Sequence, residues 1–295
     1  MKILVTGANG QLGSEIRNKS AQFPDLEYVF TDINELDITD RKAVDALCKA
    51  ESPDFLINCA AYTAVDVAES DEELAELLNT KVPAWLGSVG KERNCRIIHI
   101  STDYVFDGTA CVPYTESDLV NPESVYGKTK LNGEIALIKE NVSSIIIRTS
   151  WLYSPYGNNF AKTMIRLGLE RDELKVVFDQ VGSPTYAGDL AQTILTIISK
   201  TALQETSWKP GIYHFSNEGV CSWYDFAKAV HEKYGISCNV RPITTDEYPT
   251  PARRPAFSVL NKSKIKRVFD LRIPYWRDSL DVCIREIVRE NNQPK

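Results

Sequence analysis

Residues 1–13 read MKILVTGANGQLG and place a short apolar strand directly before a glycine-rich turn. The glycines follow the spacing G-x-x-G-x-x-G. The first allows a tight turn, the second lets a pyrophosphate approach the backbone, and the third lets the following helix pack near the strand. A helix N-terminus also offers free N–H groups to phosphate. The stretch predicts a dinucleotide-binding turn rather than a turn without a ligand. The residues expected at the cofactor are Gly7, Gly10, Gln11, Leu12 and Gly13.

Strand-like and helix-like segments alternate along the first half of the chain. Runs rich in Ile, Val and Leu suit strands that are buried on both faces of a parallel sheet. The alternation predicts an α/β fold of the doubly wound, Rossmann type. Asp37 or Thr39 is the expected N-cap of the second helix. The strands are expected at 2–6, 27–31, 54–59, 95–101 and 144–149, and the helices near 11–21, 40–50, 79–93 and 124–140.

The alternation loosens after residue 150, and no low-complexity linker separates the two halves. We expect residues 1–150 to form a dinucleotide-binding domain that is completed by parts of 185–220. Residues 151–295 should form most of a smaller, interleaved α/β substrate-binding lobe. In this half, helices are expected at 159–170, 186–200, 223–234 and 276–290, and strands at 174–178 and 211–215.

Composition excludes several classes of protein. The chain has 295 residues and a net charge of −6, which is not the basic footprint of a nucleic-acid binder. Its seven cysteines are scattered without a C-x-x-C pair, so neither a disulfide framework nor a zinc module is expected. No apolar run is long enough to span a membrane, and no signal peptide is expected. These features predict a reduced, cytoplasmic protein.

Polar and small residues at strand ends extend the predicted cofactor site. Asp32 ends the second strand, where a carboxylate can bind the adenosine ribose hydroxyls and repel a 2′-phosphate. This favours NADH over NADPH, although Asp32 could instead cap a turn. Asp37 and Ile38 are placed to contact the adenine. Small residues after the third strand would let the backbone approach the cofactor, and the segment expected there comprises Ala60, Ala61, Tyr62 and Thr63.

A Thr at the end of the strand at 95–101 and a Y-x-x-x-K pair at the start of the next long helix predict the chemistry. Tyr126 and Lys130 are four residues apart, so their side chains share one helix face. A lysine ammonium beside a phenol is expected to lower the phenol pKa from its reference value near 10. Thr102 would offer a hydroxyl to a substrate oxygen. A solvated helix face is the alternative for the isolated pair.

The order of these motifs resembles the extended short-chain dehydrogenase/reductase family, and within it the dTDP-4-dehydrorhamnose reductases. The matching stretches extend over nearly the whole chain. They are TGANGQLG (6–13), NCAAYTAVDVAES (58–70), HISTDYVFDG (99–108), VYGKTKLNGE (125–134), RTSWLY (148–153), GNNFAKTM (157–164), DQVGSPT (179–185) and YPTPARRP (248–255).

The resemblance implies reduction of the 4-keto group of a dTDP-sugar with NADH or NADPH. Tyr126 would be the general acid, assisted by Lys130 and Thr102. The resemblance also places Thr102, Asp103 and Trp151 at the sugar. Arginine favours bidentate phosphate contacts, so Arg254 could bind the pyrophosphate of the substrate, whereas Arg253 could equally be a solvated residue.

Metal dependence, oligomeric state and two other functions remain open. Some relatives hold Mg²⁺ at a dimer interface, and Glu15 is in a plausible place for this. Residues 186–189 carry only one carboxylate, however, so no metal is expected to be required. A monomer or a homodimer is expected, with no nucleic-acid or membrane partner. The alternatives are a nucleotide-sugar epimerase or dehydratase, which would share the cofactor motifs, and a non-catalytic regulatory subunit that binds NAD(P).

Overall fold

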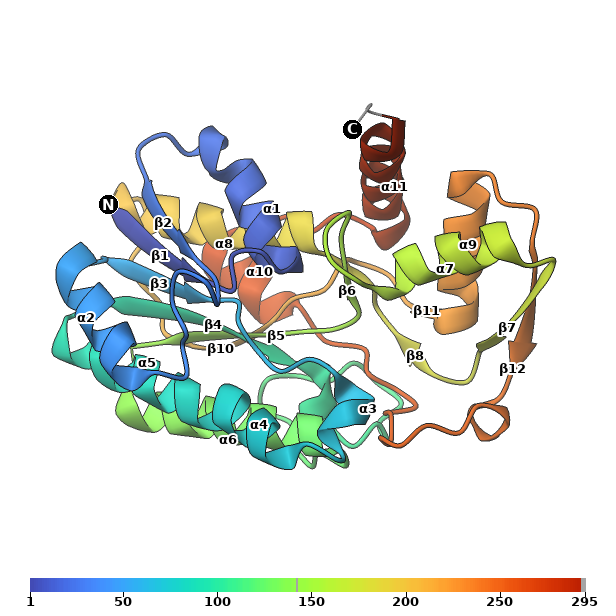
Figure 1. Cartoon of the computed structure of the whole chain (residues 1–295), viewed down its shortest axis with the longest axis horizontal. Helices are drawn as coiled ribbons and strands as arrows, with labels where there is room; N and C mark the ends of the chain where they lie inside the picture. The colour runs from blue at the N-terminus through green and yellow to red at the C-terminus, as the bar shows by residue number, and fades with distance from the viewer. Residues whose placement is uncertain (142, 293–295) are drawn as a thin grey trace.

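A six-stranded parallel sheet forms the centre of the larger part of the molecule (Figure 1). The computed structural model describes residues 1–141 and 143–292. The strand order is β10-β5-β4-β3-β1-β2, so the chain reverses direction across the sheet between β1 and β3, as in a doubly wound fold. The strands are β1 (Lys2–Thr6), β2 (Glu27–Thr31), β3 (Phe55–Asn58), β4 (Arg96–Thr102), β5 (Ile145–Thr149) and β10 (Gly211–His214).

Helices cover both faces of this sheet because its strands alternate apolar side chains between two cores. Ile3, Val5 and Ile57 face a core that includes residues of α1, α8 and α10. Leu4 and Leu56 face the opposite core, formed with α2, α5 and α6. The helices are α1 (Gln11–Lys19), α2 (Arg41–Glu51), α5 (Val82–Glu92), α6 (Val125–Glu140), α8 (Ala187–Ala202) and α10 (Ser263–Phe269).

A smaller lobe lies beside the carboxyl ends of the strands and has its own apolar core (Figure 1). Its β7 (Glu173–Val177) and β12 (Asn239–Ile243) pair in parallel, although they are far apart in sequence. Its helices are α7 (Phe160–Glu170), α9 (Trp223–Tyr234) and α11 (Trp276–Asn292). Two short strand pairs are β6 (Leu152–Tyr153) with β9 (Thr185–Tyr186), and β8 (Val181–Gly182) with β11 (Cys221–Ser222).

The expected strands and long helices are confirmed, with small differences at their ends. The N-cap of α2 is Asp40, whose carboxylate accepts from the N–H groups of Lys42 and Ala43. The expectation of Asp37 or Thr39 was wrong, because the Asp37 carboxylate is instead bound by the N–H and hydroxyl of Thr39. The shorter elements not expected are α3 (Val65–Ala68), α4 (Glu72–Glu76), the π-helix η2 (Leu77–Lys81), and the 3₁₀ helices η1 (Ser20–Gln22), η3 (Asp103–Val105) and η4 (Thr245–Glu247).

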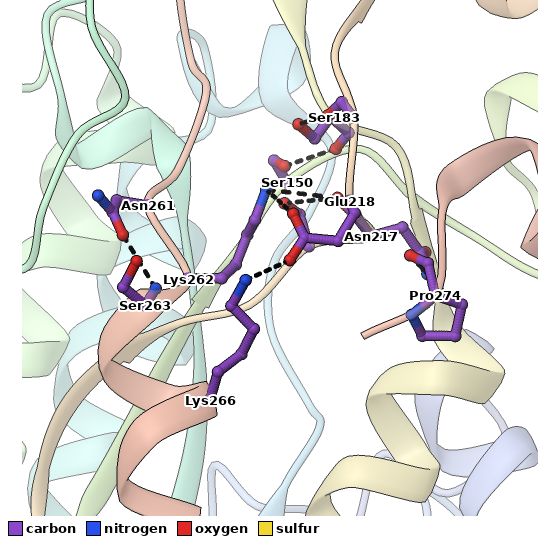
Figure 2. Close-up of polar contacts among 11 residues, drawn as sticks. Ser150, Ser183, Asn217, Glu218, Asn261, Lys262, Ser263, Lys266 and Pro274 are labelled. Atoms are coloured by element: carbon purple, nitrogen blue, oxygen red, sulfur yellow. Dashed lines mark hydrogen bonds and ion pairs between the residues drawn. The ribbon is translucent and has the colours of Figure 1, made fainter. Parts of the chain in front are cut away.

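A polar cluster joins α10 to the segments that enter the lobe (Figure 2). Glu218 accepts from Lys266 at 2.6 Å, and the Nζ of Lys262 lies 3.5 Å from its other oxygen. Nearby, Ser150 donates to the carbonyl of Ser183 at 2.7 Å. Of these residues, Ser150 lines the cavity described below. Among the described helices, none is long and apolar enough to cross a bilayer.

Candidate active site

A single cavity of about 1760 Å³ extends from the glycine turn to the lobe. Ligand pockets commonly have about 300–1,000 Å³, so this one has room for a dinucleotide and a second ligand. Gly13 and Tyr62 are the predicted site residues outside its lining. The predicted residues that line it are Gly7, Gly10, Gln11, Leu12, Asp32, Asp37, Ile38, Ala60, Ala61, Thr63, Thr102, Asp103, Tyr126, Lys130, Trp151 and Arg254.

The glycine turn depends on close backbone contacts. Gly7 has φ +66°, and a Cβ there would lie 2.7 Å from the backbone nitrogen of Ala60. A Cβ at Gly13 would lie 2.5 Å from the Cα of Ala8, so Gly13 is required for packing α1 near β1. Gly10, the N-cap of α1, has no side chain of its own to cap that helix. The free N–H groups at this end of α1 therefore suit a phosphate.

The Asp32 carboxylate supports the glycine turn from the neighbouring strand. One of its oxygens accepts from the N–H of Asn9 at 2.8 Å, and the other from the N–H of Ile33 at 2.8 Å. Asp32 nevertheless lines the cavity. The position of Asp32 is therefore compatible with both roles predicted from the sequence, which are a ribose contact and a turn cap.

Tyr62 is directed away from the cavity. Its hydroxyl donates to Asp71 at 3.2 Å, and its backbone N–H donates to the Asn79 side chain at 3.0 Å. The neighbouring residues Ala60 and Ala61 do line the cavity. The segment after β3 therefore presents small residues to a ligand, while its tyrosine supports the loop.

Tyr126 and Thr102 converge at the end of β4. Burial raises the pKa of the Tyr126 phenol to about 12, and its hydrogen bond with Thr102 offsets only part of this. The expected lowering of this pKa by Lys130 is not found, since the groups that shift it besides burial are Thr102 and Asp103. A protonated phenol suits a group that must donate a proton. Thr102 also donates to the Asp103 carboxylate at 3.1 Å.

Lys130 is a buried residue that lines the cavity. Its Nζ donates to the carbonyl of Ile100 at 2.7 Å and lies 3.4 Å from Nε2 of His99. Burial lowers the pKa of Lys130 to about 8, although Glu134 acts in the opposite direction. The lysine can therefore change its protonation state near neutral pH.

Asp103 is a buried carboxyl group beside Thr102. Burial raises its pKa to about 6, and hydrogen bonds with Ser258 and Thr102 limit the rise. The group is only 2% exposed, yet it lines the cavity. Above this pKa the carboxylate can accept a hydrogen bond from a ligand hydroxyl group.

Trp151 has a left-handed backbone conformation, with φ +48°, which is uncommon for a bulky residue. Its ring stacks on Trp223 with 3.6 Å between centroids and 10° between planes. Gly182 packs directly against the Trp151 ring, since a Cβ at Gly182 would lie only 2.7 Å from Cε2 of Trp151. Trp151 is thus held as a flat apolar wall of the cavity, by a partner that the sequence analysis did not identify.

Arg254 lines the cavity but forms a bidentate ion pair with Asp66. Its two terminal nitrogens lie 2.9 and 2.6 Å from the two carboxylate oxygens. Arg253 is more exposed and pairs with Glu123 at 2.8 Å. A pyrophosphate contact by Arg254 would have to replace or share the Asp66 contact, so it remains a prediction.

Glu15 is fully buried in α1. Burial raises its pKa to about 7, and repulsion from Glu286 adds to the rise. Within residues 1–141 and 143–292, no group of three or more His, Cys, Asp or Glu side chains is arranged to hold a metal ion.

Residues that the sequence analysis missed join the two parts of the site. Asn159 donates to the side chain of Gln11 at 3.0 Å across 148 residues of chain. Trp223 and Tyr248 also line the cavity. Asn159 lies in the quoted GNNFAKTM motif, which was a usable signal. Nothing in the local sequence marks Trp223, because its role depends on a stacking partner that is distant in the chain.

Comparisons with known proteins agree with this geometry. The family model described as "RmlD substrate binding domain" matches residues 1–289. The dTDP-4-dehydrorhamnose reductase of Aggregatibacter actinomycetemcomitans is 42% identical over 285 residues, which cover 95% of this chain and 97% of that protein.

Two solved structures extend the likeness to three dimensions. A crystal structure of a dTDP-4-dehydrorhamnose reductase from Clostridium acetobutylicum is 45% identical and has a TM-score of 0.91, with 98% of this chain and 100% of that chain covered. A structure of the enzyme from Bacillus anthracis in complex with NADP is 37% identical and has a TM-score of 0.90, with 97% and 99% covered. The chain described here belongs to the dTDP-4-dehydrorhamnose reductase family, within the extended short-chain dehydrogenases/reductases.

Proposed function

We propose that this protein reduces the 4-keto group of dTDP-4-dehydro-L-rhamnose to give dTDP-L-rhamnose, using NADH or NADPH. One observation carries the proposal. Thr102, Tyr126 and Lys130 line the same cavity as the glycine turn, in a chain that belongs to this reductase family.

The cofactor would bind in the part of the cavity nearest the glycine turn. The N–H groups at the start of α1, including that of Leu12, would hold its pyrophosphate. Asp32 would face the adenosine ribose, with Asp37 and Ile38 near the adenine. When bound, the nicotinamide supplies a hydride. Residues 1–150, with α8 and β10, would act as the cofactor-binding domain, and most of 151–295 as the substrate lobe.

The proposed chemistry of the chain itself is proton transfer and charge stabilisation. As C4 of the sugar is reduced, negative charge develops on the keto oxygen. Tyr126 donates its phenolic proton to that oxygen, and the Thr102 hydroxyl donates a hydrogen bond to it. Asp103 accepts from a sugar hydroxyl, and Trp151 packs against the apolar face of the deoxysugar. Arg254 contacts the substrate pyrophosphate.

The other functions are less well supported. An epimerase or dehydratase would share the cofactor motifs, but no Asp-Glu pair follows Thr102. The relative and both structures described above carry reductase names. A regulatory subunit would not need a Tyr126 that shares the cavity with Lys130.

The test is a nicotinamide oxidation assay with purified protein. Several dTDP-4-keto sugars are supplied with NADH and, separately, with NADPH, and the product is analysed by mass spectrometry and NMR. We expect oxidation with dTDP-4-dehydro-L-rhamnose and formation of the 4-hydroxy sugar. Absence of oxidation with both cofactors would exclude the proposed reaction. Gel filtration and light scattering would decide between monomer and homodimer.

A further inference from the structure

A row of buried polar side chains crosses the sheet beneath Lys130. The strand register places Thr6 opposite Asn58, and Asn58 opposite His99. Residues directly opposite each other on neighbouring strands point to the same face. These side chains face the layer that contains α6, and each is at most 1% exposed. A polar row inside an apolar core requires complete hydrogen bonding, so its donors and acceptors can be assigned.

The orientation of the Asn58 amide is determined by its neighbours. Its Oδ1 accepts from the Thr6 hydroxyl at 2.8 Å and from the backbone N–H of Ala60 at 3.2 Å. A backbone N–H can only donate, so the atom that faces Ala60 must be the amide oxygen. The amide nitrogen of Asn58 therefore donates to Nδ1 of His99, 3.0 Å away.

This hydrogen bond fixes the tautomer of His99. Because Nδ1 accepts, it carries no hydrogen. Burial, reinforced by the nearby Lys130, lowers the pKa of His99 well below its ordinary value, so the ring is neutral. The only N–H of the ring is then on Nε2, which lies 3.4 Å from Nζ of Lys130.

An Nε2–H group facing Lys130 favours one protonation state of the lysine. A neutral amine can accept this hydrogen with its lone pair while it donates to Ile100. An ammonium group has no lone pair, so its hydrogens would oppose the imidazole N–H. The arrangement therefore stabilises the amine relative to the ammonium.

The other charged and titratable groups near Lys130 come from three elements. Glu134, on the same helix, favours the ammonium. Arg148 of β5 binds both oxygens of Glu134, with its shortest contact at 2.7 Å, and so reduces that effect. Tyr126 precedes Lys130 by one helical turn, and Asp103 follows the end of β4. The groups that contact Nζ belong to β4 and are the Ile100 carbonyl and His99.

We propose that His99 is a positioning residue that stabilises Lys130 as a neutral amine, so that Lys130 supplies an exchangeable proton during turnover. The role in turnover rests on the proposed function. Tyr126 gives its proton to the substrate oxygen, and the phenolate takes a proton from the Lys130 ammonium, directly or through an intervening hydroxyl. The resulting amine accepts from His99 Nε2–H, and solvent restores its proton. His99 keeps its own hydrogen throughout.

The first experiment determines the tautomer of His99 in the free protein. The chain has only three histidines, so ¹⁵N-histidine labelling and long-range ¹H–¹⁵N NMR give a simple spectrum. The His99→Gln variant assigns the signal by its loss. We expect a neutral ring with hydrogen on Nε2 between about pH 6 and 9. A ring with hydrogen on Nδ1, or a protonated ring, would overturn the proposal.

The Asn58→Asp variant should reverse the tautomer of His99 while keeping the shape of the side chain at position 58. The new carboxylate still accepts from Thr6 and Ala60 and has nearly the same shape, but it cannot donate to His99. The hydrogen should therefore move to Nδ1, leaving Nε2 as an acceptor for an ammonium. Retention of the native tautomer in this variant would contradict the assigned hydrogen-bond order.

The second experiment follows the titration of Lys130 with ¹³C-labelled lysine, using Lys130→Met to assign the signal. In His99→Gln, the amide can turn its oxygen toward Nζ and favour the ammonium. We expect the proton affinity of Lys130 to rise roughly tenfold or more in this variant and in Asn58→Asp. An unchanged titration in both would overturn the proposal.

Activity measurements connect the titration to turnover. In His99→Gln, the alkaline limb of the kcat profile should move to higher pH, whereas a merely structural role would lower kcat without moving the limb. The two NMR measurements need neither substrate nor cofactor. If reductase activity is absent while the NMR results hold, only the proposed function and the turnover step fail. If activity is present while the tautomer or titration is wrong, only the role of His99 fails.

Discussion

The indole rings of Trp151 and Trp223 lie face to face with 3.6 Å between their centroids, one from the segment after β5 and one from the start of α9. They are 72 positions apart in the chain, and both pack against the apolar core of the lobe. Both line the cavity, so the orientation of Trp151 depends on Trp223.

Replacing Trp223 should therefore weaken substrate binding without direct loss of catalytic groups. An aromatic pair contributes about 0.5–1.5 kcal/mol beyond burial, so Trp223→Leu should lower kcat/KM by roughly 2- to 12-fold. The near-UV circular dichroism of the stacked indoles should diminish in the same variant. Trp223→Phe, which keeps a ring, is the control and should retain most activity. Equal kcat/KM in Trp223→Leu and the parent would show that the stack does not position Trp151.

The Tyr126→Phe change removes the proposed general acid and little else. Turnover should fall by roughly 10²- to 10⁴-fold, because the proposed general acid is lost while Thr102 can still donate only a hydrogen bond to the keto oxygen. Binding of the reduced cofactor, followed by its fluorescence, should remain close to that of the parent. Full turnover in the variant would exclude the assigned role.

Substitution of Asp32 tests whether its charge selects the cofactor. In the parent, the Asp32 carboxylate accepts from the N–H of Asn9 at 2.8 Å. The Asp32→Asn side chain keeps an oxygen that can accept this hydrogen bond, but it lacks the negative charge that would repel a 2′-phosphate. The ratio of kcat/KM with NADPH to that with NADH should therefore rise. Asp32→Ala should raise the ratio too, but with weaker binding of both cofactors because the glycine turn loses its support. A constant ratio in both variants would argue against the ribose contact.

Glu15 should make stability depend on pH. Its folded pKa, about 7, lies above its ordinary value of 4.5, so the folded state binds more protons between these values. The contribution of Glu15 to the free energy of unfolding is therefore fully present below about pH 4.5. It is lost as the pH rises to about 7, which lowers the free energy of unfolding by at most about 3 kcal/mol. Glu15→Gln should lack this loss, so its Tm should exceed that of the parent at pH 8 more than at pH 5. A pH-independent difference in Tm would contradict the prediction.

The Arg254–Asp66 pair can be used to test the pyrophosphate contact. Arg254→Ala should raise KM for the dTDP-sugar with little change in cofactor binding, because a charged hydrogen bond is lost. In the parent, a terminal nitrogen of Arg254 lies 2.6 Å from a carboxylate oxygen of Asp66. Asp66→Asn should release the guanidinium from this ion pair, so the KM for the dTDP-sugar should be unchanged or lower. Arg253→Ala is the control, since that side chain is mostly exposed. If Arg254→Ala leaves KM unchanged, Arg254 does not contact the substrate.

Local patterns were sufficient to predict much of the fold. The five strands of the first half and the helices that follow them were expected from apolar runs and periodicity, and the glycine turn from its spacing. Asp40 was missed as an N-cap because Asp37, Thr39 and Asp40 are all competent caps within four residues. The choice among them depends on where the loop places each carboxylate, which is a property of tertiary structure.

The amino-acid sequence by itself determined the parallel α/β architecture, the glycine turn at residues 6–13 and the spacing of the Tyr126/Lys130 pair, because each depends on neighbours within a few residues. Tertiary structure alone decided which groups meet at the cavity. It stacks Trp223 on Trp151, pairs Arg254 with Asp66, and sets the Thr6–Asn58–His99 row beneath Lys130. Burial then raises the pKa of Tyr126 and lowers that of Lys130, since desolvation depends on the packed surroundings of a side chain.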